Sequence, residues 1–398
     1  MIFNTWLFAV FAVITVGVYW SVVPSRFRPY YLVVAGTIFY AWAVPAYTVL
    51  IAALALATFA IGTAMLRAGD HPGRRRALLI LGVVLICAVL GFFKYTRFFS
   101  ATVNEVAARN ILPIPQIVVP LAISFFTFEF VHVLVDIYLG KIQRLDALDF
   151  AVFTMFFPTL VAGPIKRFQS FAAQLRPIVA PPPEEIALHL YRITIGVAKK
   201  TIVADSMSLL AQPIVTPGAP YGHLDYWVGT LAYTAKIYFD FTGYSDIAIG
   251  TAGLLGLSIP ENFERPYWAE NISAFWSRWH ISLSTWIRDY VFIPLGGSRR
   301  PPVVVLVNLL VAMAISGLWH GAAWTFVVWG LWHGTGLAVH RVWSQSVVPR
   351  MPALHSGRLA VRAASVVTTF AFVAFGWVLF ATSSLASAGS VYAGMLVP

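Results

Sequence analysis

The chain consists mainly of long uncharged apolar runs separated by short polar segments. Most runs are about 17–21 residues long, the helix length that crosses ~30 Å of hydrocarbon. The first run, 1–20, has no basic start and no small-residue cleavage site, which indicates a membrane helix rather than a signal peptide. The further uncharged runs are 29–47, 46–66, 77–93, 116–128, 303–319, 322–339 and 363–381.

Three more apolar segments are interrupted by polar residues. They are 150–165, 186–210 and 224–257. At least one should be re-entrant or interfacial, because irregular backbone in a membrane must be sheltered by protein or water. The pattern predicts an all-α polytopic membrane protein with roughly ten or eleven membrane-embedded helices. We expect one integral-membrane domain over 1–398, with N-terminal helices in 1–140, a catalytic core at about 150–340 and a C-terminal helix at 363–381.

The composition agrees with a membrane protein. Hydrophobic residues make up 59% of the chain and charged residues 11%, whereas a soluble domain carries about 25% charged residues. This excludes an ordinary cytosolic or secreted protein. The single cysteine, Cys87, excludes an intramolecular disulfide and a thiolate metal cluster, and its apolar neighbours predict a small buried side chain.

The cations predict the orientation of the chain. They follow the first, third and fifth runs, and the intervening loops carry few or none. The clearest of them are Arg26, Arg28, Arg67, Arg74, Arg75, Arg76, Lys141 and Arg144. The positive-inside rule makes these loops cytoplasmic and the N-terminus periplasmic. The net charge of +11 therefore reflects membrane topology rather than nucleic-acid binding.

Polar residues inside apolar segments are candidates for function. Lys236 and Asp240 are four residues apart, so they share a helix face and can pair, and Gly243 then offers a kink. The pair is either a structural ion pair or part of a polar wall that lines a cavity.

Residues 272–290 predict one amphipathic helix. Its tryptophans lie on one face, and an adjacent polar stripe brings His280 and Arg288 together. The stripe consists of Ser273, Ser277, His280, Ser284 and Arg288. The helix is either an interfacial anchor or part of a site for an anionic ligand or a polar acceptor.

Two histidines lie in identical pentapeptides, Gly-Leu-Trp-His-Gly, at 317–321 and 330–334. A neutral imidazole can act as a general base near pH 7. Each histidine could equally be a hydrogen-bonded packing residue, and spacing alone does not choose between His320 and His333.

Two prolines and a glycine interrupt the apolar segment 156–167, which favours a re-entrant turn. Lys166 and Arg167 at its end are either topology determinants or contacts for a phosphorylated ligand. Glu129 and His132 form another candidate pair, most simply a structural one. Motifs of metal hydrolases, ATPases and serine esterases are absent, and no metal site is expected.

Several ordered motifs carry a resemblance to a known family. They lie at 238–250, 260–267, 275–290, 293–298 and 317–321, with upstream matches at 39–42, 91–95, 123–128 and 157–164. Together they resemble the membrane-bound O-acyltransferase (MBOAT) family, and within it the alginate O-acetyltransferase type of membrane subunit. The resemblance covers nearly the whole chain. Glu129 and His132 depart from it, since alginate-type relatives more often carry Gln and Ser there.

The resemblance implies the MBOAT fold and transfer of an acyl group from a thioester donor to a hydroxyl. It makes His320 the invariant histidine and His280 the second catalytic histidine, with Asp240 and Tyr244 orienting reactants or stabilising the oxyanion. Acetyl-CoA is the expected donor, arriving near Lys166, Arg167 and 299–300, and no bound cofactor is expected. The other residues expected to bind substrate or line its path are Lys236, Asp246, Arg278, Trp279, Ser284, Arg288 and Trp319.

The resemblance also implies a bacterial inner-membrane location, contact with membrane lipid, a cell-envelope or exported polysaccharide as acceptor, and a periplasmic partner acyltransferase. Peptidoglycan, a lipid or a small hydroxylated molecule are alternative acceptors. An ion-coupled transporter that uses Lys236, Asp240 and Asp246, or a non-catalytic membrane scaffold, are the alternatives from other classes.

Overall fold

The computed structural model describes residues 5–217, 221–350 and 359–397. Within these ranges the chain is mainly helical, and an isolated bridge pairs Phe263 with Trp279. The chain divides into two compact units. The first comprises Met1–Val197 and Tyr244–Pro260, and the second comprises Ala198–Gly243 and Glu261–Pro398.

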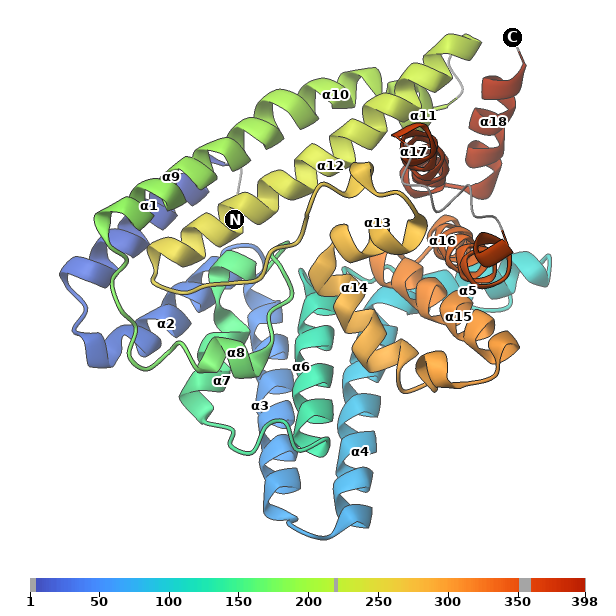
Figure 1. The fold of residues 1–398 in the computed structure, drawn as a ribbon. Coiled ribbons are helices and arrows are strands. Elements are labelled where there is room, and N and C mark those ends of the chain that lie inside the picture. Colours follow the sequence, from blue (N-terminus) through green and yellow to red (C-terminus); the bar gives the residue numbers. More distant parts are fainter. Residues whose placement is uncertain (1–4, 218–220, 351–358, 398) are drawn as a thin grey trace. The chain divides into compact units, whose positions relative to one another are not determined.

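Three helices of the first unit pack side by side (Figure 1). They are α3 (Pro45–Arg67), α4 (Pro72–Leu90) and α6 (Ile123–Tyr138). Gly62 and Gly82 have no side chain where Ile137 and Leu134 of α6 pack, so the helices approach closely. The other α-helices that begin in this unit are α1 (Trp6–Ser21), α2 (Arg28–Ala41), α5 (Thr96–Val106), α7 (Ala147–Met155), α8 (Phe168–Ala172) and α9 (Pro183–Ala198).

The second unit is built on a helical hairpin of α15 (Pro302–His320) and α16 (Trp324–Val342). A Cβ at Gly317 would overlap the carbonyl oxygen of Phe326 and come within 3.3 Å of the Gly330 Cα. The two pentapeptides therefore cross at their first glycines, with backbone against backbone. The remaining α-helices are α10 (Asp205–Leu210), α11 (Gln212–Val215), α12 (His223–Leu254), α13 (Ile272–Arg278), α14 (Ile281–Ile287), α17 (Leu359–Ala381) and α18 (Leu385–Leu396).

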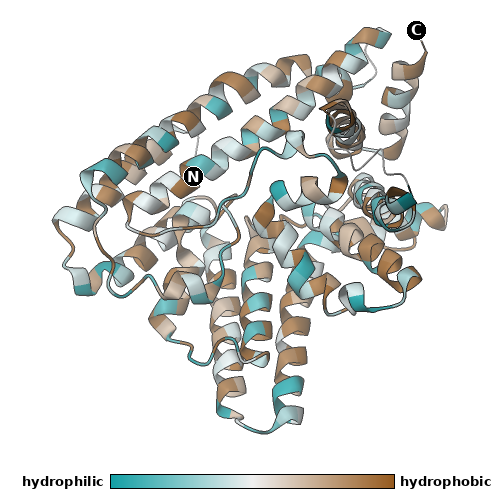
Figure 2. Ribbon diagram, in the orientation of Figure 1, coloured by the Kyte–Doolittle hydropathy of each residue, from teal (hydrophilic) through white to brown (hydrophobic). Residues whose placement is uncertain are grey.

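The outer faces of the long helices are apolar (Figure 2). Among the described residues, four helical segments are long and apolar enough to span a membrane: Pro45–Arg67, Pro72–Val106, Pro302–His320 and Leu359–Ala381. Only 11% of the apolar window in Pro72–Val106 is buried within the protein. Apolar surface of this extent requires lipid around it. The chain is therefore a helical, polytopic membrane protein, as the run lengths predict.

One predicted span is misplaced. The run 116–128 is not one helix, since residues 111–120 are non-helical and α6 covers Ile123–Tyr138 instead. Pro113, Pro115 and Pro120 lack the N–H that a helix needs, and Ala122 is left-handed with φ 58°. Hydropathy alone placed the span too early and left the polar side chains of α6 outside it.

The predicted single helix over 272–290 is also wrong. α13 ends at Arg278, His280 has φ 45°, and α14 begins at Ile281. The segment around Asn262 explains this break, because its carbonyl accepts from the Ile281 N–H at 3.0 Å and its side chain accepts from the Ser282 hydroxyl at 2.7 Å. The predicted polar stripe is consequently divided between two helices.

Cys87 is exposed on α4 and not buried as predicted. Its apolar neighbours reflect a helix face that requires lipid rather than a protein core. The expected kink in α12 is not a break in the helix, which runs unbroken through Gly243. The division between the two units falls at that glycine.

A methyl group at the helix crossing should destabilise the second unit. In Gly330→Ala the new Cβ would overlap the carbonyl oxygen of Met313, a backbone atom that cannot turn aside. We expect a loss of about 1–3 kcal/mol of stability. Thermal unfolding in detergent measures it. Gly17→Ala on α1 is the matched control, since no atom lies within 4 Å of its added Cβ. Equal melting temperatures for both variants would contradict the packing described here.

Candidate active site

His320 and His280 lie together in the second unit. Their ring centroids are 6.2 Å apart, and Trp319 packs on the His280 ring at 5.7 Å. His320 is the last residue of α15, where Gly321 continues in an extended conformation. His280 lies at the break between α13 and α14, which removes its backbone from both helices.

His280 is almost completely buried, with 1% of its surface exposed. Neither ring nitrogen has a hydrogen-bond partner in the part of the chain that the structure describes. Phe241 packs edge-on against the ring at 4.6 Å. A buried imidazole without a protein partner is costly, and such a group is more readily explained by a reactant than by packing.

Aromatic side chains enclose His320. Trp329 of α16 contacts its ring at 5.2 Å and Phe380 of α17 at 5.1 Å. His320 itself is half-buried, and these apolar rings reduce the contact of its imidazole with water and so strengthen electrostatic interactions beside it. Among the described residues, no group of three His, Cys, Asp or Glu side chains is arranged to hold a metal ion.

His333 packs against Trp329 and not against His280. Its ring is 4.9 Å from Trp329 and 5.1 Å from Trp276, and it is fully buried. Both histidines of the repeated pentapeptide thus border one indole ring, from different sides of the helix crossing. The structure brings His320, and not His333, to His280.

The predicted pairing of Lys236 with Asp240 is wrong. Asp240 forms an ion pair with Lys200 at 3.1 Å, and Lys200 also binds Asp205 at 2.7 Å. A π-helical stretch over Lys199–Ala204 precedes α10 and carries this lysine. The Lys236 ammonium lies 5.4 Å from the centroid of the Tyr233 ring instead. Spacing along one helix could not reveal a partner from another.

Tyr244 and Asp246 belong to the first unit, on the last turns of α12. Asp246 forms an ion pair with Arg192 of α9 at 3.0 Å. Both residues therefore belong to a different unit from His280 and His320.

Lys166 is buried in the first unit, with its ammonium 2.5 Å from the Glu129 carboxylate. The Phe153 ring lies 4.4 Å from the same ammonium. His132 accepts from the Phe168 N–H at 3.1 Å, so Glu129 and His132 each have a partner of their own. These contacts fix the non-helical segment before α8 to α6, and they turn Lys166 away from the protein surface.

The remaining expected site residues have varied surroundings. Trp279 is buried against Phe275 and Trp377, and Ser284 donates to the Trp279 carbonyl at 3.1 Å. Arg278 and Arg167 are both half-buried. Arg288 pairs with Asp289 at 2.9 Å and, because of the helix break, is not part of a continuous stripe with His280.

Arg288 instead lines a cavity of about 670 Å³. Its other walls are Phe292, Ile293, Gly296, Gly297, Ser298, Arg299 and Arg300. Gly296 and Gly297 have φ 109° and 54°, a turn that only glycine adopts readily. Neither Arg299 nor Arg300 forms an ion pair within the described ranges, so two unpaired guanidinium groups face this cavity.

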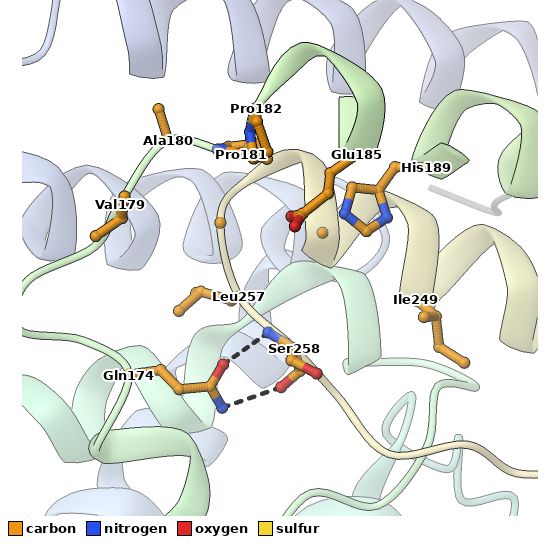
Figure 3. A pocket seen from close by; sticks show the side chains of 12 residues that line it. Gln174, Val179, Ala180, Pro181, Pro182, Glu185, His189, Ile249, Leu257 and Ser258 are labelled. Atoms are coloured by element: carbon orange, nitrogen blue, oxygen red, sulfur yellow. Dashed lines mark hydrogen bonds between the residues drawn. The ribbon is translucent and has the colours of Figure 1, made fainter. Parts of the chain in front are cut away.

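The first unit has a cavity of its own, of about 470 Å³ (Figure 3). Gln174 bridges the backbone of Ser258, accepting from its N–H at 2.7 Å and donating to its carbonyl at 3.1 Å. Glu185 and His189 of α9 line one wall. The His189 ring occupies the space that a side chain at Gly253 would need. No positively charged side chain lines this cavity, which makes it a poor site for a phosphorylated donor.

The sequence alone did not indicate Trp329, Phe380 or Asn262. Trp329 immediately precedes the second pentapeptide, and that proximity is the one signal that could have found it. Phe380 comes from a distant helix and left no pattern along the chain. Asn262 lies within the motif at 260–267, but its loop hydrogen bonds could not be predicted from the sequence.

Known proteins are similar in sequence to this chain over most of its length. The model of the membrane-bound O-acyltransferase family, MBOAT, matches residues 98–384. The protein named "Probable alginate O-acetylase AlgI" from Azotobacter vinelandii is 38% identical over 98% of this chain and 77% of its own length. The protein of the same name from Pseudomonas aeruginosa is 37% identical over 98% of this chain and 74% of its own.

A relative whose name gives a different activity also matches this chain along its full length. The "Peptidoglycan O-acetyltransferase" of Helicobacter pylori is 33% identical over 100% of this chain and 80% of its own length. These matches confirm the resemblance seen in the motifs. The chain belongs to the membrane-bound O-acyltransferase family and is an O-acyltransferase family enzyme.

Proposed function

We propose that this chain transfers an acetyl group from a thioester donor to a hydroxyl of a cell-envelope or exported polysaccharide. The observation that carries the proposal is the contact between the buried His280 and the half-buried His320, with aromatic rings packed around both. It supplies a proton acceptor and a second imidazole without a competing charged partner for His280. Direct transfer needs no covalent nucleophile, and Cys87 belongs to the other unit.

The reaction begins with proton transfer to His320. Its imidazole takes the proton of the acceptor hydroxyl while that oxygen attacks the thioester carbonyl carbon. The carbonyl oxygen gains negative charge, and the carbon–sulfur bond then breaks. The thiolate leaves with the proton held on His320, which returns to its neutral form. His280 orients the acceptor, and the aromatic walls protect the thioester from hydrolysis.

The donor is acetyl-CoA, bound by its phosphates in the arginine-lined cavity. Arg299 and Arg300 supply unpaired charge there. Asn308 of α15 donates to the Leu295 carbonyl at 3.1 Å, and Leu295 directly precedes Gly296 of the cavity wall. From Asn308 to His320 the helix measures roughly 18 Å at about 1.5 Å per residue. An extended pantetheine arm reaches a comparable distance. Lys166 is buried against Glu129 and is not a donor contact in this proposal.

The acceptor is a polymer with sugar hydroxyls. The printed names of the relatives include an alginate O-acetylase and a peptidoglycan O-acetyltransferase, and both polymers fit this description. Peptidoglycan is accordingly the leading alternative acceptor, ahead of a lipid or a small molecule. A periplasmic partner acyltransferase completes delivery to an exported chain.

The setting is the bacterial inner membrane, with a periplasmic N-terminus and cytoplasmic arginine-rich loops. Besides the four long spans, the shorter apolar helices α1 and α18 lie in the membrane, and further helices complete the roughly ten or eleven embedded helices expected from the sequence. The transporter alternative has less support, because Asp240 and Asp246 already have cationic partners.

Removing the proton acceptor should nearly abolish transfer. In His320→Ala we expect kcat to fall by about 10²–10⁴-fold, the usual contribution of general-base assistance. The measurement is acetyl transfer from labelled acetyl-CoA to purified envelope polysaccharide by enzyme in nanodiscs. His71→Ala in an exposed loop is the control. Wild-type turnover in His320→Ala would refute the mechanism, and ion flux without acetyl turnover would favour a transporter.

Removing charge from the arginine cavity should weaken donor binding selectively. In Arg299→Gln and Arg300→Gln we expect KM for acetyl-CoA to rise about tenfold each, because a hydrogen bond to a charged group contributes about 1.5–3 kcal/mol. S-acetylpantetheine lacks the phosphates, so its KM should not change. Arg109→Gln, in a loop of the first unit, serves as the control. Equal effects on both donors would place the phosphates elsewhere.

A further inference from the structure

Trp329 is the most tightly enclosed residue beside His320. None of its surface is exposed. The rings of Trp377 and Phe380 pack against it at 5.7 Å and 5.1 Å, and those of His320 and His333 at 5.2 Å and 4.9 Å. With aromatic rings on all these sides, the indole has one available orientation.

The indole N–H of Trp329 has no acceptor. Its Nε1 atom is buried, and no hydrogen bond to it exists within the described part of the chain. An N–H buried without an acceptor costs about 1–3 kcal/mol. Native proteins rarely retain such groups unless they are used, and an indole N–H can only donate. The natural partner is therefore an oxygen of a bound molecule.

The helix crossing determines how far Trp329 lies from His320. Gly317 precedes His320 by three residues, and Gly330 directly follows Trp329. Because the backbones of α15 and α16 touch at these glycines, neither ring can withdraw from the other. The donor is thus preorganised, which is the condition under which hydrogen bonds to a developing charge are most effective.

The other polar groups nearby are less suited to this task. Asp240, as a carboxylate, accepts hydrogen bonds and already pairs with Lys200. Trp276 has a buried indole N–H without a partner, but its histidine contact is with His333 and not with His320. His280 contacts the His320 ring and is needed to orient the acceptor.

We infer that the indole N–H of Trp329 donates a hydrogen bond to the carbonyl oxygen of the acyl donor. This inference rests on the transfer reaction proposed above. When the acceptor oxygen attacks, electrons of the carbonyl double bond move onto that oxygen, and the hydrogen bond from Trp329 strengthens. When the carbon–sulfur bond breaks, the double bond re-forms, and the negative charge passes to the thiolate, which takes the proton from His320. Trp329 gains and loses no proton, and it is a catalytic residue because it touches the reacting carbonyl.

The test removes the indole N–H and keeps an aromatic side chain at position 329. In Trp329→Phe we expect kcat to fall by about 10²–10³-fold with little change in the KM for acetyl-CoA, as for loss of one oxyanion donor. A tryptophan analogue with benzothiophene in place of indole, introduced at position 329 by stop-codon suppression, removes the N–H and keeps the bicyclic shape of the side chain. Trp276→Phe is the matched control, since its N–H is equally buried and unpaired but is not beside His320.

A donor analogue tests the contact directly. Dithioacetyl-CoA carries sulfur in place of the carbonyl oxygen, and sulfur is a weaker hydrogen-bond acceptor. The kcat ratio between acetyl-CoA and dithioacetyl-CoA should be at least tenfold larger in the wild type than in either position-329 variant. A purely structural role of the ring would leave this ratio unchanged.

The outcomes separate the two proposals. If the wild type transfers acetyl groups and both variants match it, the inference about Trp329 is overturned while the proposed function stands. The inference also fails if both variants are slow but show the wild-type ratio between the two donors. If the folded wild type transfers no acetyl group at all, the proposed function itself is wrong.

Discussion

The contact of two helix backbones at Gly317 and Gly330 is the constraint on which the candidate active site depends. It fixes α15 against α16, and so it fixes His320 against Trp329. Without side chains at the crossing, dispersion contacts between backbones replace the hydrophobic driving force that helices lack in lipid. The repeated pentapeptide is therefore explained by packing, since each copy supplies one of the two glycines, and only its first histidine borders His280.

Among the described residues, each buried carboxylate or ammonium group forms an ion pair with an opposite charge. Lys166 meets Glu129 and the Phe153 ring, while Asp246 meets Arg192. Breaking such a pair would leave an uncompensated charge in a low-dielectric surrounding, at a cost of about 3–5 kcal/mol. The unpaired guanidinium groups of Arg299 and Arg300 are distinct from these because they are exposed and line a cavity.

Run length predicted α3, α15, α16 and α17 closely, because hydrocarbon thickness is a single strong constraint on helix length. The motifs were sufficient to identify the family and to point to His320 and His280. Sequence could not show the break at His280, which Asn262 causes through loop hydrogen bonds, or the Lys200 partner of Asp240. Both depend on contacts between segments distant along the chain, and helical periodicity carries no record of them.

The helix crossing and the two rings beside it are encoded in one short segment of the chain. His320, Trp329 and both crossing glycines lie within fourteen residues of sequence, Gly317 to Gly330. His280 and Phe380, in contrast, come from other segments of the second unit. A local hairpin therefore sets the distance between His320 and Trp329, while the other rings around His320 depend on contacts between segments distant in sequence.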